Sequence, residues 1–258
     1  MIKLKTEAEL DAIERAGAIV AETLEMVTDR VEPGISTGQL DASAEELIRS
    51  HPGAEPAFKG LYGFPASLCT SINNEVVHGI PSPDRHLESG DILSVDVGVK
   101  LDGFYADAAV TVPAGEIEPE TTHLLEVTRR ALDAGVEVAR SGSRLGDIGA
   151  AIQEIVEDAG YSVIRELVGH GVGEAPHEEP HVPNFGKRGR GTALLEGLVI
   201  AIEPMVNMGR RRIRTLNDSW TVVTADGSLS AHFEHTVAVT SDGPRIMTRL
   251  PARSPAGD

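Results

Sequence analysis

Apolar residues recur every three or four positions in four segments of the chain, which is the spacing of an amphipathic helix. Capping-box patterns, in which Thr or Ser is followed three residues later by Glu or Gln, open the first two segments at Thr6 and Ser36. Gly160 is a stop signal after the last segment. We therefore expect four helices that pack on a core, beginning after Thr6 and Ser36 and spanning about 122–139 and 144–159.

Two apolar strands end on an acidic residue, and each follows a glycine at the same distance. The segments are Gly90–Asp96 (GDILSVD) and Gly197–Glu203 (GLVIAIE). Downstream, Asp107 in DAAVTV echoes Glu234 in EHTVAV, and upstream glycines and aliphatic residues repeat at a constant offset. Such a repeat indicates two similar halves, each with two helices followed by two acid-bearing strands. The alternative is a chance coincidence of glycines and aliphatic residues.

The repeated acids stand where an apolar strand face is expected. Burying an unpaired carboxylate costs several kcal/mol or forces it to bind a proton, so acids in equivalent places suggest a shared cation. Asp102-Gly103 is a two-residue hairpin signal that pairs Gly98 with Asp107. In that register Asp96 and Asp107 share a face with their α-carbons roughly 7 to 8 Å apart, close enough to reach one cation site.

Three histidines lie in glycine- or proline-containing loops that suit the aiming of a side chain. His170 stands between two glycines after an apolar run, 163–168, that predicts a strand; His177 lies in GEAPHEEP and His78 in HGIP. Four carboxylates and one neutral imidazole form a hard, oxygen-rich ligand set, and the single cysteine excludes a cysteine-rich site. We expect a two-metal hydrolytic centre that takes Mn(II), Fe(II), Co(II) or Zn(II).

Length and composition limit the remaining possibilities. The 258 residues, 41% of them hydrophobic, suit one catalytic domain at about 1–250, with halves at about 1–115 and 116–250. Residues 251–258 have the composition of a disordered tail. No apolar run approaches the length of a membrane span, and the start lacks a signal-peptide pattern. With a single cysteine, Cys69, which excludes a disulfide framework, these features predict a cytoplasmic protein.

The charge of the chain is strongly negative. A net charge of −17 argues against DNA or general nucleic-acid binding, which needs a basic surface. Two glycine-punctuated segments, Lys187–Arg190 and Arg210–Arg214, are locally basic and are predicted to be hairpin tips. They are either solvated turns with no partner or a docking surface for RNA-rich machinery such as the ribosome.

Dispersed motifs in a fixed order cover nearly the whole chain and resemble those of the type I methionine aminopeptidases. They are Gly63–Asn73 (GFPASLCTSIN), Val77–Pro81 (VHGIP), Asp96 with Asp107, Gly169–Gly173 (GHGVG), Pro176–Pro180 (PHEEP), Ile202–Met205 (IEPM), Trp220 and Phe233–Thr236 (FEHT). The resemblance implies an α+β pita-bread fold, in which two pseudo-symmetric halves form a curved antiparallel sheet covered by helices. It also implies a monomer that uses two divalent metal ions to remove the N-terminal methionine from nascent polypeptides whose second residue is small.

The resemblance also assigns roles to single residues. Five are implied metal ligands: Asp96 on one metal, Asp107 and Glu234 as bridges, and His170 with Glu203 on the other. Glu203 is the implied proton shuttle, His177 stabilises the developing oxyanion, and His78 contacts the substrate backbone and its leaving nitrogen. The implied pocket for the methionine side chain consists of Leu61, Phe64, Cys69, Pro176 and Trp220.

Four positions depart from the family pattern and put the dimensions of the pocket in doubt. The family often has tyrosine at Leu61, cysteine at Val77, phenylalanine at Pro176 and glutamine at His232. Trp220 and Cys69 also have simpler interpretations, as a core tryptophan and a small buried hydrophobic residue.

Two other functions compete with methionine removal. An X-Pro dipeptidase or aminopeptidase P resembles this fold and ligand set but generally carries an additional N-terminal domain. A catalytically silent pita-bread protein that binds the ribosome is the other alternative, against which the intact ligands and loop histidines argue. A type II methionine aminopeptidase would need a helical insertion, for which the interval between His177 and Glu203 leaves no room.

Overall fold

The computed structural model describes residues 2–249, so the predicted tail at 251–258 lies outside the described residues. Its four α-helices are α1 (Glu7–Thr28), α2 (Thr37–Ser50), α3 (Pro119–Glu137) and α4 (Leu145–Asp158), which confirms the four predicted helices. Both capping boxes form: the Thr6 hydroxyl accepts the backbone N–H of Glu9, and Ser36 accepts that of Gln39. None of the helices in the described range combines the length and apolar character of a membrane span.

The strands form antiparallel pairs throughout the described part of the chain. A 3₁₀ turn, η1 (Leu61–Gly63), lies near the first sheet, and the strands are β1 (Glu55–Pro56), β2 (Leu68–Ile72), β3 (Glu75–Val77), β4 (Asp91–Leu101), β5 (Phe104–Ala114), β6 (Ser162–Val163), β7 (Gly169–Gly171), β8 (Glu178–Val182), β9 (Val199–Ile202), β10 (Met205–Asn207), β11 (Ile213–Thr215), β12 (Val222–Thr224), β13 (Ser230–His232), β14 (His235–Thr240) and β15 (Gly243–Ile246). The two larger sheets have the orders β1-β4-β2, with β5 paired to β4, and β15-β14-β9-β7-β8.

The hairpin between β4 and β5 has the predicted register. Gly98 pairs with Asp107, and the two turn residues Asp102 and Gly103 have φ values of 51° and 86°. Positive φ at both positions is the requirement of a tight hairpin turn that matches the twist of its strands. Asp96 and Asp107 therefore lie on one face of the sheet.

The strand predicted over 163–168 is wrong in extent. β6 covers only Ser162–Val163, and the last backbone contact to β10 is the Ile164 N–H, which donates to the Met205 carbonyl at 3.1 Å. Arg165 and Glu166 are exposed and interrupt the apolar run. Arg165 instead places its guanidinium over the Phe185 ring, 5.0 Å from the centroid.

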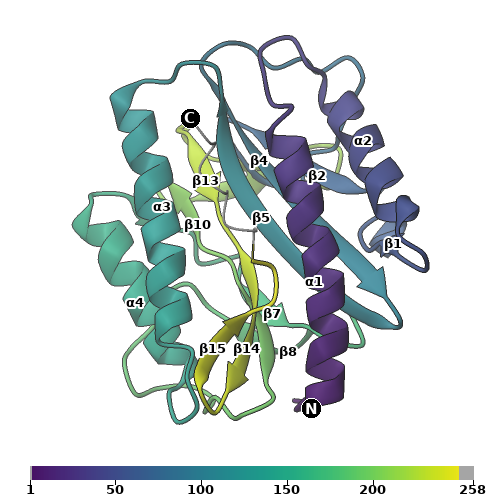
Figure 1. Cartoon of the computed structure of the whole chain (residues 1–258). Coiled ribbons are helices and arrows are strands. Elements are labelled where there is room, and N and C mark those ends of the chain that lie inside the picture. Colours follow the sequence, from purple (N-terminus) through teal and green to yellow (C-terminus); the bar gives the residue numbers. More distant parts are fainter. Residues whose placement is uncertain (1, 250–258) are drawn as a thin grey trace, which may run out of the picture.

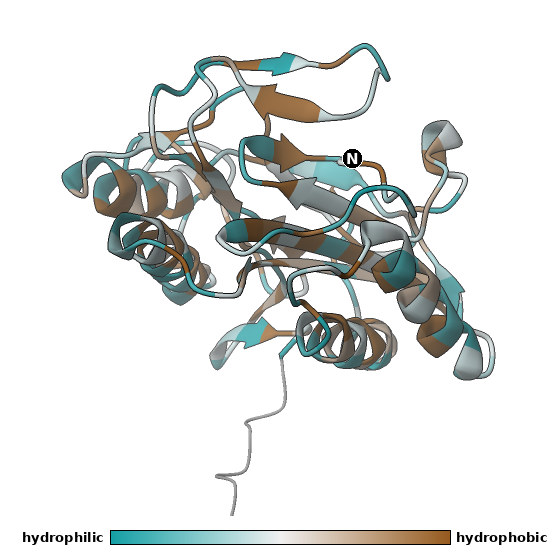
Figure 2. Cartoon of the chain, turned by 90° about the horizontal axis from the view of Figure 1, so that it is seen from above, coloured by the Kyte–Doolittle hydropathy of each residue, from teal (hydrophilic) through white to brown (hydrophobic). Residues whose placement is uncertain are grey.

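Each large sheet has its own helix pair and its own apolar core. One core joins α1 and α2 to β4 and β5, and the other joins α3 and α4 to β9 and β14. Figure 1 shows α1 crossing β4 and β5, with α3 and α4 beside the strands of the second sheet. Coloured by hydropathy, the helices have hydrophobic and hydrophilic sides, as half-buried helices require (Figure 2).

The two sheets meet along β5 and the chain that enters β14. The Glu234 N–H donates to the Ala109 carbonyl at 2.9 Å. The Thr111 hydroxyl accepts the His232 N–H and donates to the His232 carbonyl, both at 2.8 Å. This seam places the acids of the first sheet against those of the second.

Packing of α1 predicts an unusual response to a helix-favouring substitution. A Cβ at Gly17 would lie 2.2 Å from the Met247 carbonyl oxygen. We expect Gly17→Ala to lower the free energy of unfolding by about 1–3 kcal/mol in urea denaturation, because backbone must move. Ala18→Gly, on the exposed side of α1, is the control and should lose about 1 kcal/mol through helix propensity alone. Stabilisation by Gly17→Ala would contradict this packing.

Candidate metal centre

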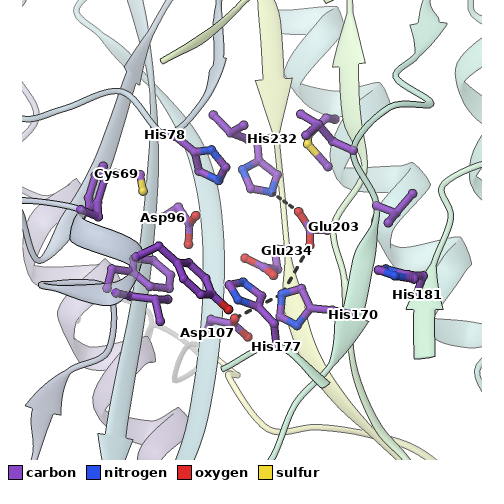
Figure 3. A pocket seen from close by; sticks show the side chains of 18 of the residues that line it. Cys69, His78, Asp96, Asp107, His170, His177, His181, Glu203, His232 and Glu234 are labelled. Carbon is purple, nitrogen blue, oxygen red and sulfur yellow. Dashed lines mark ion pairs between the residues drawn. The ribbon is translucent and has the colours of Figure 1, made fainter. Parts of the chain in front are cut away.

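A cavity of about 590 Å³ opens beside the seam between the two sheets. All five predicted ligands and both predicted catalytic histidines line it: Asp96, Asp107, His170, Glu203, Glu234, His78 and His177. Figure 3 shows these side chains converging: the ligands come from β4, β5, β7, the chain after β9 and the chain before β14, and His78 and His177 come from the chain after β3 and before β8. Residues far apart in the sequence thus share one site.

Strand pairing delivers the four acids to the cavity. Asp96 and Asp107 project from the hairpin of β4 and β5. Glu203 directly follows β9 and Glu234 directly precedes β14, and these strands end together because Ile202 pairs with His235. The backbone carbonyl of Glu203 accepts the side-chain N–H of the fully buried Asn184 at 2.9 Å, which fixes the chain where it leaves the sheet.

The tightest group of possible ligands contains one residue from the first sheet and two from the second. Ligand atoms of Asp107, His170 and Glu234 all lie within 4.8 Å of one another. The His170 Nε2 is 3.6 Å from an Asp107 oxygen and 3.6 Å from Glu203 Oε1. Asp96 lies outside this tight group, and its buried Oδ1 has no hydrogen-bond partner within the described residues.

His170 presents one particular nitrogen to the acids. Its Nδ1 lies 3.0 Å from the Gly171 carbonyl, which can only accept, so Nδ1 donates there and Nε2 is the nitrogen that faces the acids. The flanking glycines allow neighbouring strands to approach. A Cβ at Gly169 would lie 2.2 Å from the Ala201 carbonyl oxygen, and one at Gly171 would lie 2.3 Å from that of Glu179.

The electrostatics of the cavity favour a bound cation. Burial, followed by the charge of Asp107, raises the pKa of Asp96 well above its usual value. Burial and the charges of neighbouring acids likewise raise the pKa values of Glu203 and Glu234. A cation stabilises the ionised forms that this crowding disfavours. The orphaned oxygen of Asp96, the crowded carboxylates and the His170 Nε2 that faces them fit a divalent metal.

Asp107 is held in place from the opposite sheet. The Thr236 hydroxyl lies 2.9 Å from Asp107 Oδ1 and 2.8 Å from the Asp107 carbonyl, and it accepts the Asp107 N–H at 3.1 Å. Thr236 is fully buried. Nothing in the local sequence around Thr236 indicated this role, because the contact spans 129 positions.

The loop histidines stand around the acids. His78 has a left-handed φ of 60°, and burial lowers its pKa. The His177 ring lies 4.4 Å from that of His170 and stacks on Tyr62 at 6.2 Å. Desolvation by the cavity walls, followed by the neighbouring His170, lowers the pKa of His177 to about 4. Both imidazoles are therefore neutral near pH 7.

An apolar wall borders the acids. Four of the five predicted pocket residues line the cavity, namely Leu61, Phe64, Cys69 and Trp220, whereas Pro176 is not among the lining residues. Phe64 and Trp220 meet edge to face at 5.1 Å. Burial, followed by the charge of Asp96, raises the pKa of the Cys69 thiol well above its usual value, so Cys69 is a neutral wall residue.

The sequence analysis assigned no site role to several of the lining residues. They are Phe58, Tyr62, Glu166, Leu167, Val168, Glu178, Glu179, His181 and Met205. Gly98 on β4 makes room for Phe58, because a Cβ at Gly98 would lie 2.7 Å from its ring. Val77 and His232, two of the positions that depart from the family pattern, also line the cavity.

The fold and the site together define a metal-dependent hydrolase with the pita-bread architecture. The chain belongs to metallopeptidase family M24, whose family model matches residues 11–241. A methionine aminopeptidase from Clostridium perfringens (strain 13 / Type A) is 54% identical over 97% of this chain and 100% of its own length. The crystal structure of the methionine aminopeptidase from Rickettsia prowazekii matches with a TM-score of 0.94 and 44% identity, covering 96% of this chain and 100% of that one.

A prolidase shares the architecture at greater distance. The prolidase from Pyrococcus horikoshii OT3 matches with a TM-score of 0.78 and 22% identity, over 97% of this chain and 64% of the prolidase chain. At this identity the likeness extends to the fold alone.

The crowding of acids predicts the effect of neutralising one of them. Asp107→Asn keeps an oxygen that can accept from Thr236 but removes a charge at the centre of the cluster. We expect the variant to keep its near-ultraviolet circular dichroism and to lose at least one metal ion per chain in equilibrium dialysis against Mn(II) or Co(II). Asp102→Asn, at the exposed tip of the same hairpin, is the control and should bind metal like the parent protein. Unchanged metal content in Asp107→Asn would contradict a site centred on this residue.

Proposed function

We propose that the protein is a methionine aminopeptidase, which hydrolyses the bond after an N-terminal methionine when the second residue is small. The observation that carries this proposal is the direct junction between the carboxylate–imidazole cluster and the apolar wall around Phe64 and Trp220. Such a junction suits a peptide whose first side chain is apolar and unbranched. The names of the two relatives with 44% and 54% identity support the same activity.

We propose that the site takes two divalent metal ions. Membership of family M24 supports a divalent metal, and the number follows from the count of available donors. Asp107 and Glu234 would be shared between the ions, Asp96 would bind one, and His170 with Glu203 would bind the other. When bound, the ions supply Lewis acidity and lower the pKa of a water at the site.

The residues of the chain then divide the remaining work. Glu203, whose pKa is raised by burial and by its acidic neighbours, carries a proton from the attacking water towards the leaving amine. Neutral His177 donates an N–H to the carbonyl oxygen as negative charge develops there. His78, whose backbone is left-handed, lies across the acid cluster from His177 (Figure 3). It contacts the peptide after the methionine.

Peptide turnover tests this function. The purified protein, reconstituted separately with Mn(II), Fe(II), Co(II) or Zn(II), should release methionine from Met-Ala-Ser but not from Met-Lys-Ser, because a large second residue obstructs the cavity. Chromatographic quantification of free methionine is the measurement. Equal cleavage of both peptides contradicts the proposal, and cleavage of Ala-Pro-Ala instead would identify an X-Pro hydrolase.

Nascent polypeptides are the substrates that this activity implies, and we propose that the protein acts on them in the cytoplasm beside the ribosome. Neither basic segment is the predicted hairpin tip: Lys187–Arg190 lies between β8 and β9, and Arg210–Arg214 lies between β10 and β11 and extends into β11, and neither pair of strands is hydrogen-bonded together. Both segments are nevertheless exposed and support ribosome contact, although Arg188 and Arg211 already pair with glutamates of this chain. The double variant Arg190→Glu/Arg214→Glu should therefore lose cosedimentation with ribosomes at low salt. The control is Arg130→Glu on the exposed side of α3. If both variants cosedimented equally with ribosomes, the proposed ribosome contact through these segments would be contradicted.

A further inference from the structure

The loop that carries His177 has no helix or strand of its own. It joins Gly171, at the end of β7, to Glu178, at the start of β8. His177 is exposed at the cavity, and its ring contacts are edge-on to His170 and stacked on the exposed Tyr62. A catalytic imidazole in such a loop needs a rigid support, because misplacement by about 1 Å can cost about 10²-fold in rate.

The side chain of Glu178 closes this loop. Its Oε1 accepts the backbone N–H of Glu174 at 2.8 Å and that of Ala175 at 3.2 Å. Both N–H groups belong to the stretch that leads into His177, and Glu178 is the next residue after it. One carboxylate thus holds the two ends of the segment 174–178 together.

The other oxygen of Glu178 is bound by a residue from the beginning of the chain. The Lys5 ammonium donates to Glu178 Oε2 at 2.8 Å, and the two side chains are only 2% and 13% exposed. The Lys5 N–H also donates to the Gly197 carbonyl at 2.6 Å, so the segment before α1 is anchored to the turn that precedes β9. The contact with Glu178 spans 173 positions.

Gly173 leaves room for this lysine within the loop itself. A Cβ at Gly173 would lie 2.2 Å from Lys5 Cε and 2.4 Å from Nζ. The lysine therefore occupies a slot that the loop provides. Because the pair is largely buried, removing the lysine leaves the Glu178 carboxylate without its counter-charge, and we expect the loop to rearrange around it.

We propose that Lys5 is a positioning residue: through Glu178 it fixes the loop 173–178 and thereby the place of the His177 imidazole beside the metal centre. This inference rests on the proposed role of His177 in peptide hydrolysis. Lys5 is not itself a lining residue and pairs with none of the implied ligands; it reaches the cavity wall only through Glu178, so its effect passes through the loop.

The same segment provides a matched control. Lys3 pairs with Glu174 of the same loop, but these side chains are 59% and 51% exposed. Exposed ion pairs contribute little. Lys3→Met therefore removes the same charge from the same segment, and only the burial of the pair differs from Lys5→Met.

Kinetics on Met-Ala-Ser test the proposal. In metal-loaded protein, Lys5→Met should lower kcat by about 10²-fold with KM changed by less than about threefold, since binding groups stay in place. Lys3→Met should match the parent protein. In a His177→Ala background Lys5→Met should cause no further loss of kcat, and a full additional loss there would overturn the proposal in favour of a general effect on folding.

Charge rescue and hydrogen exchange complete the test. Glu178→Gln keeps an oxygen for the two loop N–H groups, so Lys5→Met/Glu178→Gln should recover most of the kcat lost by Lys5→Met alone. Amide exchange in 172–179 should accelerate in Lys5→Met and not in Lys3→Met. Amide exchange is measured without substrate. If the parent protein failed to release methionine, the proposed function would be refuted, but exchange would still test whether Lys5 fixes the loop. Unchanged exchange in Lys5→Met would overturn the proposal that Lys5 fixes the loop through Glu178.

Discussion

Four carboxylates that share one cavity are the constraint on which the rest of the structure depends. Burial and the charges of neighbouring acids raise the pKa values of three of them, Asp96, Glu203 and Glu234. Without a cation the inexpensive response would be protonation or separation of the acids. The fold prevents separation, because each acid is attached to a strand or strand end whose backbone hydrogen bonds are already committed. The fold thus holds the acids close together, and this arrangement favours the binding of a divalent metal.

The seam between the sheets turns two separate ligand pairs into one centre. Thr236 and Thr111 each use one hydroxyl to bind backbone groups across the seam, and Thr236 also reaches the Asp107 carboxylate. Both threonines are fully or almost fully buried, so water does not compete for these contacts. We propose that the sheets represent two halves of one catalytic domain, at about 1–115 and 116–250. The site belongs to neither half alone.

Local chemistry decided which features the sequence could predict. Capping boxes and the Asp102-Gly103 turn act over a few residues, and they predicted the helix starts and the register that joins Gly98 to Asp107. The repeat predicted the acids but not the strand register of the second half. If β9 and β14 were paired as β4 and β5 are, Ile202 would lie opposite Val237, but it pairs with His235, two residues away. A shift of two keeps the same face inward, so the acids still converge. Thr236, the Lys5 support and the exclusion of Pro176 from the cavity wall depend on contacts between distant segments, which no local pattern encodes.

The surroundings of Glu203 distinguish it from the other acids and support its proposed role as the proton carrier. Asp107 commits Oδ1 to Thr236, whereas the two oxygens of Glu203 face the Nε2 atoms of His170 and His232 at 3.6 Å, longer than a hydrogen bond. Burial, followed by the charge of His78, lowers the pKa of His232 to about 3, so this imidazole is neutral and does not hold the carboxylate as an ion pair. A proton carrier needs a raised pKa and an uncommitted oxygen. Among the four acids, Glu203 combines both with a position at the cavity surface between the imidazoles of His170 and His232.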